Sequence, residues 1–260
     1  MKSFVRATAL IARTHFLRAL TSRRTLSCVA LAFLPALAAF LVTGISARAS
    51  AAPLFANLGW IMMLQIVVPL VTLIAGSAIV AEEVEDRTIT YLFTRPIPRP
   101  ALMFGRFLST GVVVSTVLLV GVLLLYLACG RARGEGAPVD AGLAWPFVTA
   151  VAWGVVVYSA IFASLGAFFR HPMLIGIGYA FAIEGFLANL PGKNQALTVQ
   201  FYLRSLIAQS PSPSWRGVEG FSSTAFDPAG RAHAVLAVIL VVVIALGAWR
   251  LARRQFELTS

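Results

Sequence analysis

The residues of this chain that could do chemistry are concentrated in one short segment. Glu82, Glu83, Glu85 and Asp86 supply four of the ten acidic residues within five positions, and Arg87 follows them directly. Clustered carboxylates can act as acids and bases or can pair with basic groups of a partner. A further carboxylate, Glu184, stands alone inside a long apolar stretch. A charge there is costly unless it faces a cavity or a partner, so Glu184 is a second candidate.

Other kinds of site lack the residues they need. The chain has no Gly-x-x-x-x-Gly-Lys-Ser/Thr phosphate loop, since Gly192-Lys193-Asn194 has neither the spacing nor the hydroxyl. The two cysteines and three histidines do not have the spacing of metal ligands. Cys28 and Cys129 are expected near opposite membrane faces, which makes a disulfide between them implausible. We therefore expect no catalytic, cofactor or metal site on this chain.

The composition is that of an integral membrane protein. Apolar residues make up 59% of the chain and charged residues 12%, and the mean hydropathy is +0.86. The net charge of +11 could indicate nucleic-acid binding in a soluble protein. Here the basic residues stand mainly at the ends of apolar stretches, as in proteins oriented in a bilayer. The expected partner is thus the lipid bilayer and not a nucleic acid.

Six apolar segments are long enough to cross about 30 Å of hydrocarbon at about 1.5 Å per residue. They cover residues 26–45, 58–80, 108–128, 143–168, 172–190 and 234–251. The fifth is short and carries Glu184. The segments define a six-span transmembrane domain over residues 26–260, preceded by a basic leader over residues 1–25.

The basic residues set the orientation. With the N-terminus inside, most of the 21 basic residues are cytoplasmic, and the outer loops keep only seven. These seven are Arg48, Arg131, Arg133, Lys193, Arg204, Arg216 and Arg231. The bias predicts that both termini are cytoplasmic. The leader is either a helix lying on the inner leaflet or simply an anchor that fixes the topology.

The loop over residues 191–233 is expected outside, before the last span. Apolar residues recur in it at helical spacing, namely Ala196, Val199, Leu203, Leu206 and Ile207, with Gln195, Arg204 and Ser205 off that face. Ser210-Pro211 then ends the helix, because proline has no N–H donor. The pattern predicts an external amphipathic helix that lies on the outer surface or dips into it.

The acidic cluster belongs to a cytosolic loop over residues 81–107, between spans two and three. We expect a helix there with the acids in its first turns, where carboxylates face the positive end of the helix dipole. Arg95-Pro96-Ile97-Pro98-Arg99-Pro100 must turn or extend. A short charged helix held between two spans could transmit force from a cytosolic partner. The alternative is that the acids only stabilise a solvated helix start.

At these residues the sequence resembles the ABC-2 type permease family, the membrane subunits of ATP-driven exporters. The family carries Glu-x-Glu-x-Gly-Thr, then Leu-Leu, then Pro-x-x-Arg after its second span. The matching residues are Glu83, Glu85, Thr88, Leu92-Phe93, Pro96 and Arg99, and Arg87 replaces the glycine. The ending Thr-Arg-Pro-Ile-Pro-Arg is similar to the branch that includes the permease serving nitrous oxide reductase maturation.

The resemblance implies an all-α, six-span permease of the type V exporter kind in the bacterial inner membrane. It implies a dimer, with a homodimer favoured, that binds two copies of a separate cytosolic ATPase, which would hold ATP and magnesium. The loop after span two would be the coupling helix, with Glu82, Glu83, Glu85, Asp86, Arg87, Thr88, Leu92, Arg95, Pro96 and Arg99 as its coupling residues. Spans two and five line the pathway in that family, so Gln65 and Glu184 become candidate pathway residues. Glu184 could instead be a hydrogen-bonded structural acid.

Two other functions are compatible with parts of the sequence. Residues 82–87 also fit the Glu-Glu-x-x-x-Arg signature of intramembrane CAAX-type proteases. Those enzymes need histidines within the bilayer, and His15, His171 and His233 do not stand in the required contexts. A membrane scaffold with the permease fold but without transport is the other alternative.

Overall fold

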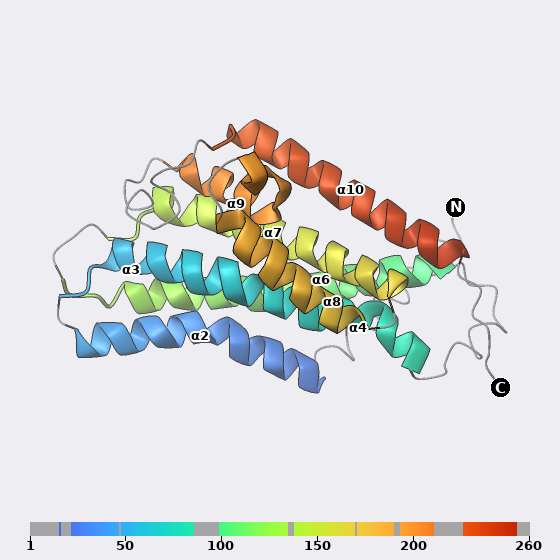
Figure 1. Cartoon of the computed structure of the whole chain (residues 1–260). Coiled ribbons are helices and arrows are strands. Elements are labelled where there is room, and N and C mark those ends of the chain that lie inside the picture. Colours follow the sequence, from blue (N-terminus) through green and yellow to red (C-terminus); the bar gives the residue numbers. More distant parts are fainter. Residues whose placement is uncertain are drawn as a thin grey trace.

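The protein is a bundle of long helices (Figure 1). The computed structural model describes residues 16, 22–46, 48–85, 99–134, 138–169, 171–189, 193–210 and 226–253, of which 78–85, 99–104, 189, 193 and 251–253 by backbone only. All elements in these ranges are helical. They are α2 (Arg23–Ile45), α3 (Ala51–Asn57), the π-helix η1 (Leu58–Val67), α4 (Val68–Glu85), α6 (Arg99–Cys129), α7 (Ala141–Phe168), α8 (Pro172–Gly178), the π-helix η2 (Tyr179–Phe186), the 3₁₀ turns η3 (Leu187–Asn189) and η4 (Lys193–Leu197), α9 (Val199–Ala208) and α10 (Ala229–Arg253).

Five helices are long and apolar enough to cross a membrane. They are Arg23–Ile45, Ala51–Ser77, Gly105–Cys129, Ala141–Phe168 and Ala229–Arg250. The fifth expected span is shorter, since its apolar helix covers only Pro172–Phe186. The seven residues of α8 and the eight of η2 would extend about 22 Å at about 1.5 Å each, against about 30 Å of hydrocarbon. The all-helical membrane fold is confirmed, and the count of six full spans is not.

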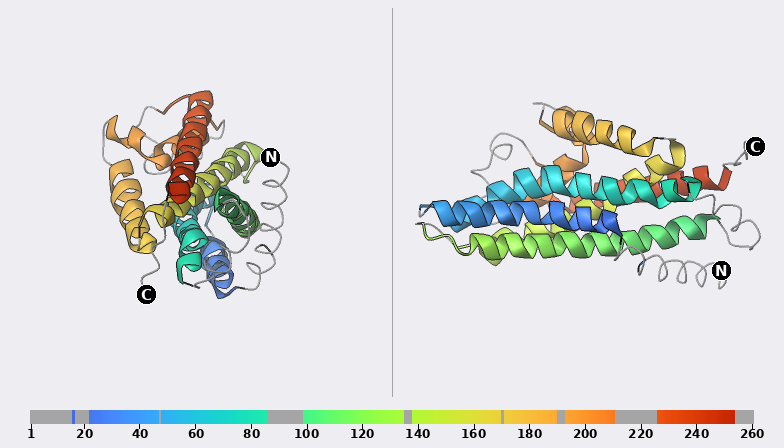
Figure 2. Two further views of the ribbon diagram at one scale, coloured as in Figure 1. Left: turned by 90° about the vertical axis from the view of Figure 1, so that its right-hand side faces the viewer. Right: turned by 90° about the horizontal axis from the view of Figure 1, so that it is seen from below.

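The long helices lie side by side, so the bundle has two ends (Figures 1 and 2). At one end, which we call the Arg23 end, α2 begins, the described part of α4 stops, α6 begins and α10 finishes. At the other, the Arg48 end, α2 and α6 finish and α7 and α10 begin. Cys28 lies near the start of α2 and Cys129 ends α6, and both are free and buried. The two cysteines thus lie toward opposite ends of the bundle.

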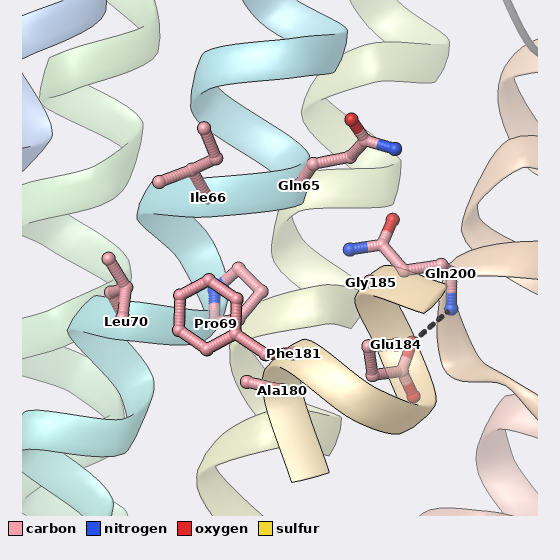
Figure 3. A pocket seen from close by; sticks show the side chains of 9 residues that line it. All are labelled: Gln65, Ile66, Pro69, Leu70, Ala180, Phe181, Glu184, Gly185 and Gln200. Atoms are coloured by element: carbon pink, nitrogen blue, oxygen red, sulfur yellow. Dashed lines mark hydrogen bonds between the residues drawn. The ribbon is translucent and has the colours of Figure 1, made fainter. Parts of the chain in front are cut away.

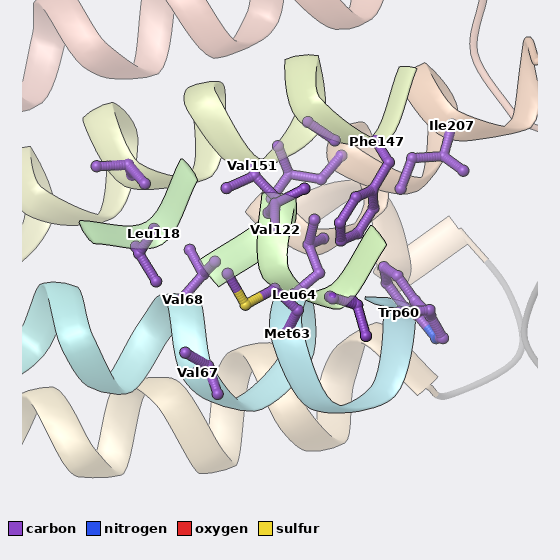
Figure 4. Close-up of a cluster of buried hydrophobic side chains, with 14 of the residues drawn as sticks. Trp60, Met63, Leu64, Val67, Val68, Leu118, Val122, Phe147, Val151 and Ile207 are labelled. Atoms are coloured by element: carbon purple, nitrogen blue, oxygen red, sulfur yellow. The ribbon is translucent and has the colours of Figure 1, made fainter. Parts of the chain in front are cut away.

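The core lies where η1 and α4 pack against α6, α7 and α9 (Figure 4). Trp60, Leu64, Leu118 and Phe147 are buried there almost completely. Small residues let the helices approach closely, as is common in membranes. A Cβ on Gly121 of α6 would lie 2.6 Å from the Ala32 carbonyl oxygen of α2. The contact shows that α2 and α6 pack with their backbones near each other.

Several boundaries differ from the sequence prediction. α6 begins at Arg99 with Pro100 in its first turn, where the missing N–H donor costs nothing. The proline run was expected to be non-helical as far as Pro100, and this was wrong for its last two residues. α10 begins at Ala229, five residues before the predicted start of span six. The leader over residues 1–25 lies outside the described residues except for Phe16 and residues 22–25.

Candidate functional site

Glu184 is buried on η2 and is the centre of a hydrogen-bonded cluster. Its side chain is 3% exposed. The Tyr179 hydroxyl donates to Oε1 at 2.7 Å, and the Tyr158 hydroxyl of α7 donates to Oε2 at 2.8 Å. The backbone N–H groups of Val199 and Gln200 donate to Oε1 at 3.0 Å and to Oε2 at 2.9 Å. Each carboxylate oxygen therefore accepts two hydrogen bonds, which satisfies its acceptor capacity.

The cluster fixes the start of α9. Thr198 is the N-cap of α9, and its side chain accepts a hydrogen bond from the Phe201 N–H. Glu184 accepts from the two N–H groups in between, and the Thr198 N–H donates to the Gln195 carbonyl oxygen at 3.0 Å, so all four donors at this helix start are satisfied. The positive end of the α9 dipole also points at the carboxylate. Glu184 thus joins the short fifth apolar helix to α9.

α9 itself lies inside the bundle. Every residue from Val199 to Ile207 is buried, and the helix packs on α7 and α10. The helix predicted in this loop is present, but protein surrounds it on all sides, and this burial was not among the two expected positions. Arg204 and Ser205, which were placed off its apolar face, are 1% and 0% exposed. α9 is therefore part of the core in the half of the bundle nearer the Arg48 end. Its polar side chains are buried against other parts of the protein as well.

Arg204 brings a cation into this core. Its guanidinium carbon lies 4.6 Å from the centroid of the Trp60 ring, a cation–π distance, and Nη1 donates to the Ala188 carbonyl oxygen at 3.1 Å. Burial lowers the pKa of Arg204 to about 10, while the charge of Glu184 acts to raise it. The guanidinium therefore keeps its charge at neutral pH. A cation and a carboxylate are both held in the same buried region, each with its own hydrogen bonds.

A pocket opens beside the cluster (Figure 3). Its volume is about 180 Å³, and it is lined by Gln65, Ile66, Pro69, Leu70, Ala180, Phe181, Glu184, Gly185 and Gln200. Ile66 is 47% exposed and Phe181 is 64% exposed, so the pocket has its mouth at the outer surface of the bundle. The structure brings Gln65 and Glu184, the two candidate pathway residues, to the walls of one pocket.

Two π-helical segments contribute to the pocket. Gln65 and Ile66 belong to η1, and Phe181 and Glu184 belong to η2. π-Helical segments are rare and are frequently found at functional sites. Two of them facing one pocket single out this part of the protein within the described residues.

The predicted coupling residues that the structure describes lie away from this pocket. Glu82, Glu83 and Glu85 occupy the last described turns of α4, and Arg99 is the first residue of α6, all at the Arg23 end. The acids were expected in the first turns of a separate helix, and this was wrong, because α4 continues without a break from the core to Glu85. Asp86, Arg87, Thr88, Leu92, Arg95 and Pro96 lie outside the described residues.

The sequence analysis missed the partners of Glu184. Tyr158 and Tyr179 stand in apolar segments without a motif around them, and nothing in the sequence brings Trp60 to Arg204. Trp60 is 1% exposed and lies under Arg204. The sequence did contain one signal for this cluster. Glu184 is a lone carboxylate in the fifth apolar segment, which also carries Tyr179, and Tyr158 lies in the fourth.

His171 and His233 are the two histidines that the structure describes. His171 precedes α8 and is exposed, and His233 packs against Trp153 with ring centroids 5.8 Å apart in the first turns of α10. Among the described residues, no three His, Cys, Asp or Glu side chains are grouped so that they could hold a metal ion.

Comparison with known proteins identifies the family. A family model described as ABC-2 family transporter protein matches residues 4–256 of the 260. A search among curated proteins found no match.

Proposed function

The chain belongs to the ABC-2 transporter family, and we propose that it is the permease subunit of an exporter driven by a separate ATPase. In this proposal the substrate crosses the membrane along the side of the bundle formed by η1, α4 and η2. The pocket that carries Gln65 and Glu184 is the substrate site. The chain itself performs no covalent chemistry.

One observation carries the proposal more than any other. The helix that forms one wall of the pocket also leads to the acidic cluster. Pro69 and Leu70 line the pocket at the start of α4, and the same helix continues for 18 residues to Glu85. At about 1.5 Å per residue this is about 27 Å of uninterrupted helix. A force applied near Glu85 would therefore reach the pocket wall through a stiff element.

The Arg23 end would face the cytoplasm of a bacterial cell, with the protein in the inner membrane and both termini inside. The excess of basic residues expected on that side supports this orientation. The acids near Glu85 would then be available to a cytosolic ATPase. Their charges would pair with basic groups of that partner and set its orientation more than its affinity.

The ATPase would bind in two copies, each against one permease of a dimer, and would hold the ATP and magnesium. A homodimer is the simplest arrangement. ATP binding closes the ATPase pair and moves the coupling segments, and hydrolysis releases them, so that the pocket opens in turn to each side of the membrane. Membership of the branch that includes the permease serving nitrous oxide reductase maturation stays a prediction, based on the Thr-Arg-Pro-Ile-Pro-Arg sequence at residues 94–99.

Co-purification tests the proposal. The tagged chain is expressed with a candidate ABC ATPase of the same organism, extracted in mild detergent, and examined for a stable complex with equal numbers of permease and ATPase chains. The variant Glu83→Lys/Glu85→Lys should lose the ATPase, because both charges change sign. The variant Asp140→Lys, which changes an acid at the opposite end of the bundle, is the matched control and should keep it. A chain that never retains the ATPase would instead be a scaffold of permease fold.

A further inference from the structure

The pocket beside Glu184 contains a buried acceptor that the described part of the chain leaves without a donor. Gln200 is 1% exposed, and its Nε2 donates to the Leu64 carbonyl oxygen at 3.0 Å. Its Oε1 is buried and accepts no hydrogen bond from any described residue. Buried polar atoms in native proteins nearly always have a partner, so this oxygen calls for a donor that the described residues do not supply.

A second amide lies near Gln200. Gln65 of η1 also lines the pocket (Figure 3), and its side chain is only partly buried. The pocket thus offers an unsatisfied oxygen and a second amide that is able to donate and accept. These are the groups that recognise a small polar head with at least one O–H or N–H.

The carboxylate nearby is already satisfied. Both oxygens of Glu184 are occupied by the two tyrosine hydroxyls and the start of α9. Arg204 lies within electrostatic reach of the same carboxylate. A ligand with a full charge would be buried next to this cluster without a counterion of its own, and that is costly. The cluster therefore favours an uncharged head.

The remaining walls are apolar. Ile66, Pro69, Leu70 and Phe181 surround the polar end, and Ile66 and Phe181 are also exposed at the mouth. Further exposed apolar side chains continue along the short helix, including Leu174 and Phe186. An apolar chain attached to the head would leave the pocket over this surface without meeting a polar group.

We propose that the pocket binds the uncharged, hydrogen-bond-donating head of an amphipathic molecule, with the donor on Gln200 Oε1 and the apolar chain over Phe181. That this amphipathic molecule is the transported substrate rests on the exporter function proposed above. Binding itself requires no ATPase, so it can be tested separately.

The test is photo-crosslinking of the full chain in lipid nanodiscs. The probe is 1-monododecanoylglycerol with a diazirine in its acyl chain, and adducts are located by mass spectrometry. Adducts are expected on residues 65–70 and 180–185. Unlabelled 1-monododecanoylglycerol should compete. Its di-O-methyl ether, which has no donor, should compete about tenfold less well, because the buried oxygen then stays unpaired. Dodecyl sulfate and dodecyltrimethylammonium should also compete poorly.

Two variants link the selectivity to the amides. Gln200→Met removes the unpaired oxygen at similar volume and should abolish the preference for the free glycerol over its ether. Gln65→Leu, at a partly exposed position whose side chain makes no hydrogen bond to the described residues, should weaken crosslinking of the glycerol probe without affecting folding. Gln209→Met, which changes an exposed glutamine at the end of α9, is the matched control and should behave as the parent.

The outcomes separate this inference from the proposed function. Equal competition by all four head groups, or adducts elsewhere with none in the pocket, would overturn the inference even in a chain that binds and stimulates its ATPase. Selective binding in a chain that retains no ATPase would support the pocket and refute the exporter.

Discussion

Tyr179 and Glu184 are five residues apart in one helix, and the Tyr179 hydroxyl donates a 2.7 Å hydrogen bond to Glu184 Oε1. In an α-helix, residues five apart are separated by about 140° around the axis, since each residue turns about 100°. A π-helix, whose hydrogen bonds join residues five apart, brings them onto nearly the same face. The π-helical winding of η2 is thus what allows this pair to form.

The first prediction concerns Glu184→Gln. The amide would accept at one oxygen only, so two of the four donors that now meet the carboxylate would lose their acceptor. We expect a loss of about 1–3 kcal/mol in stability and faster amide exchange at the start of α9. Hydrogen–deuterium exchange of a peptide covering residues 198–208 measures the second effect. Asp140→Asn, which replaces the N-cap of α7 by an equally good cap, should leave exchange at α9 unchanged.

The same variant tests the pathway role of Glu184. If the pocket is the substrate site, loosening its wall should lower transport and substrate-stimulated ATP hydrolysis. Unchanged values for both, in a complex that still assembles, would show that Glu184 is only a structural acid.

A second prediction concerns Arg204→Lys. The ammonium keeps the charge but loses the planar group that lies over Trp60 and donates to Ala188. We expect a destabilisation of about 1–2 kcal/mol, seen as a lower melting temperature in detergent. Arg231→Lys is the matched control. Arg231 is 69% exposed in its ion pair with Asp227, and such surface pairs contribute little. Equal melting temperatures for the two variants would contradict the buried role of Arg204.

A third prediction compares two glycines of α8. A Cβ on Gly176 would collide with Leu73 of α4, while a Cβ on Gly178 would meet no atom within 4 Å. Gly176→Ala should therefore lower the melting temperature by forcing α8 away from α4. Gly178→Ala should be neutral or slightly stabilising, because alanine favours a helix. A neutral Gly176→Ala would mean that α8 and α4 pack less closely than described.

Much of the fold could be predicted because hydrophobicity and length are sufficient to find helices in a membrane protein. The helix from Val199 was also expected, from the spacing of Val199, Leu203, Leu206 and Ile207. Its burial on all sides was not, because Arg204 marks a polar face in the sequence. Only the tertiary structure shows that this face meets Trp60 and Ala188.

The site was predicted in part. A carboxylate inside an apolar segment is informative, so Glu184 could be selected, and Gln65 followed from the family resemblance. Gln200 and Tyr179 could not be found in this way. Gln200 comes from a loop helix that folds back into the bundle, and Tyr179 reaches Glu184 only in a π-helix, which helical periodicity does not reveal.

The most direct test of the account is the rate of ATP hydrolysis by the partner ATPase in lipid vesicles, with and without this chain. The parent chain should change the rate by severalfold. Glu83→Gln/Glu85→Gln should reduce that effect to near zero with the pocket intact, while Asp140→Asn retains it. Hydrolysis that is the same with the parent chain, with the double variant and with no permease would contradict the claim that this chain couples ATP hydrolysis to transport.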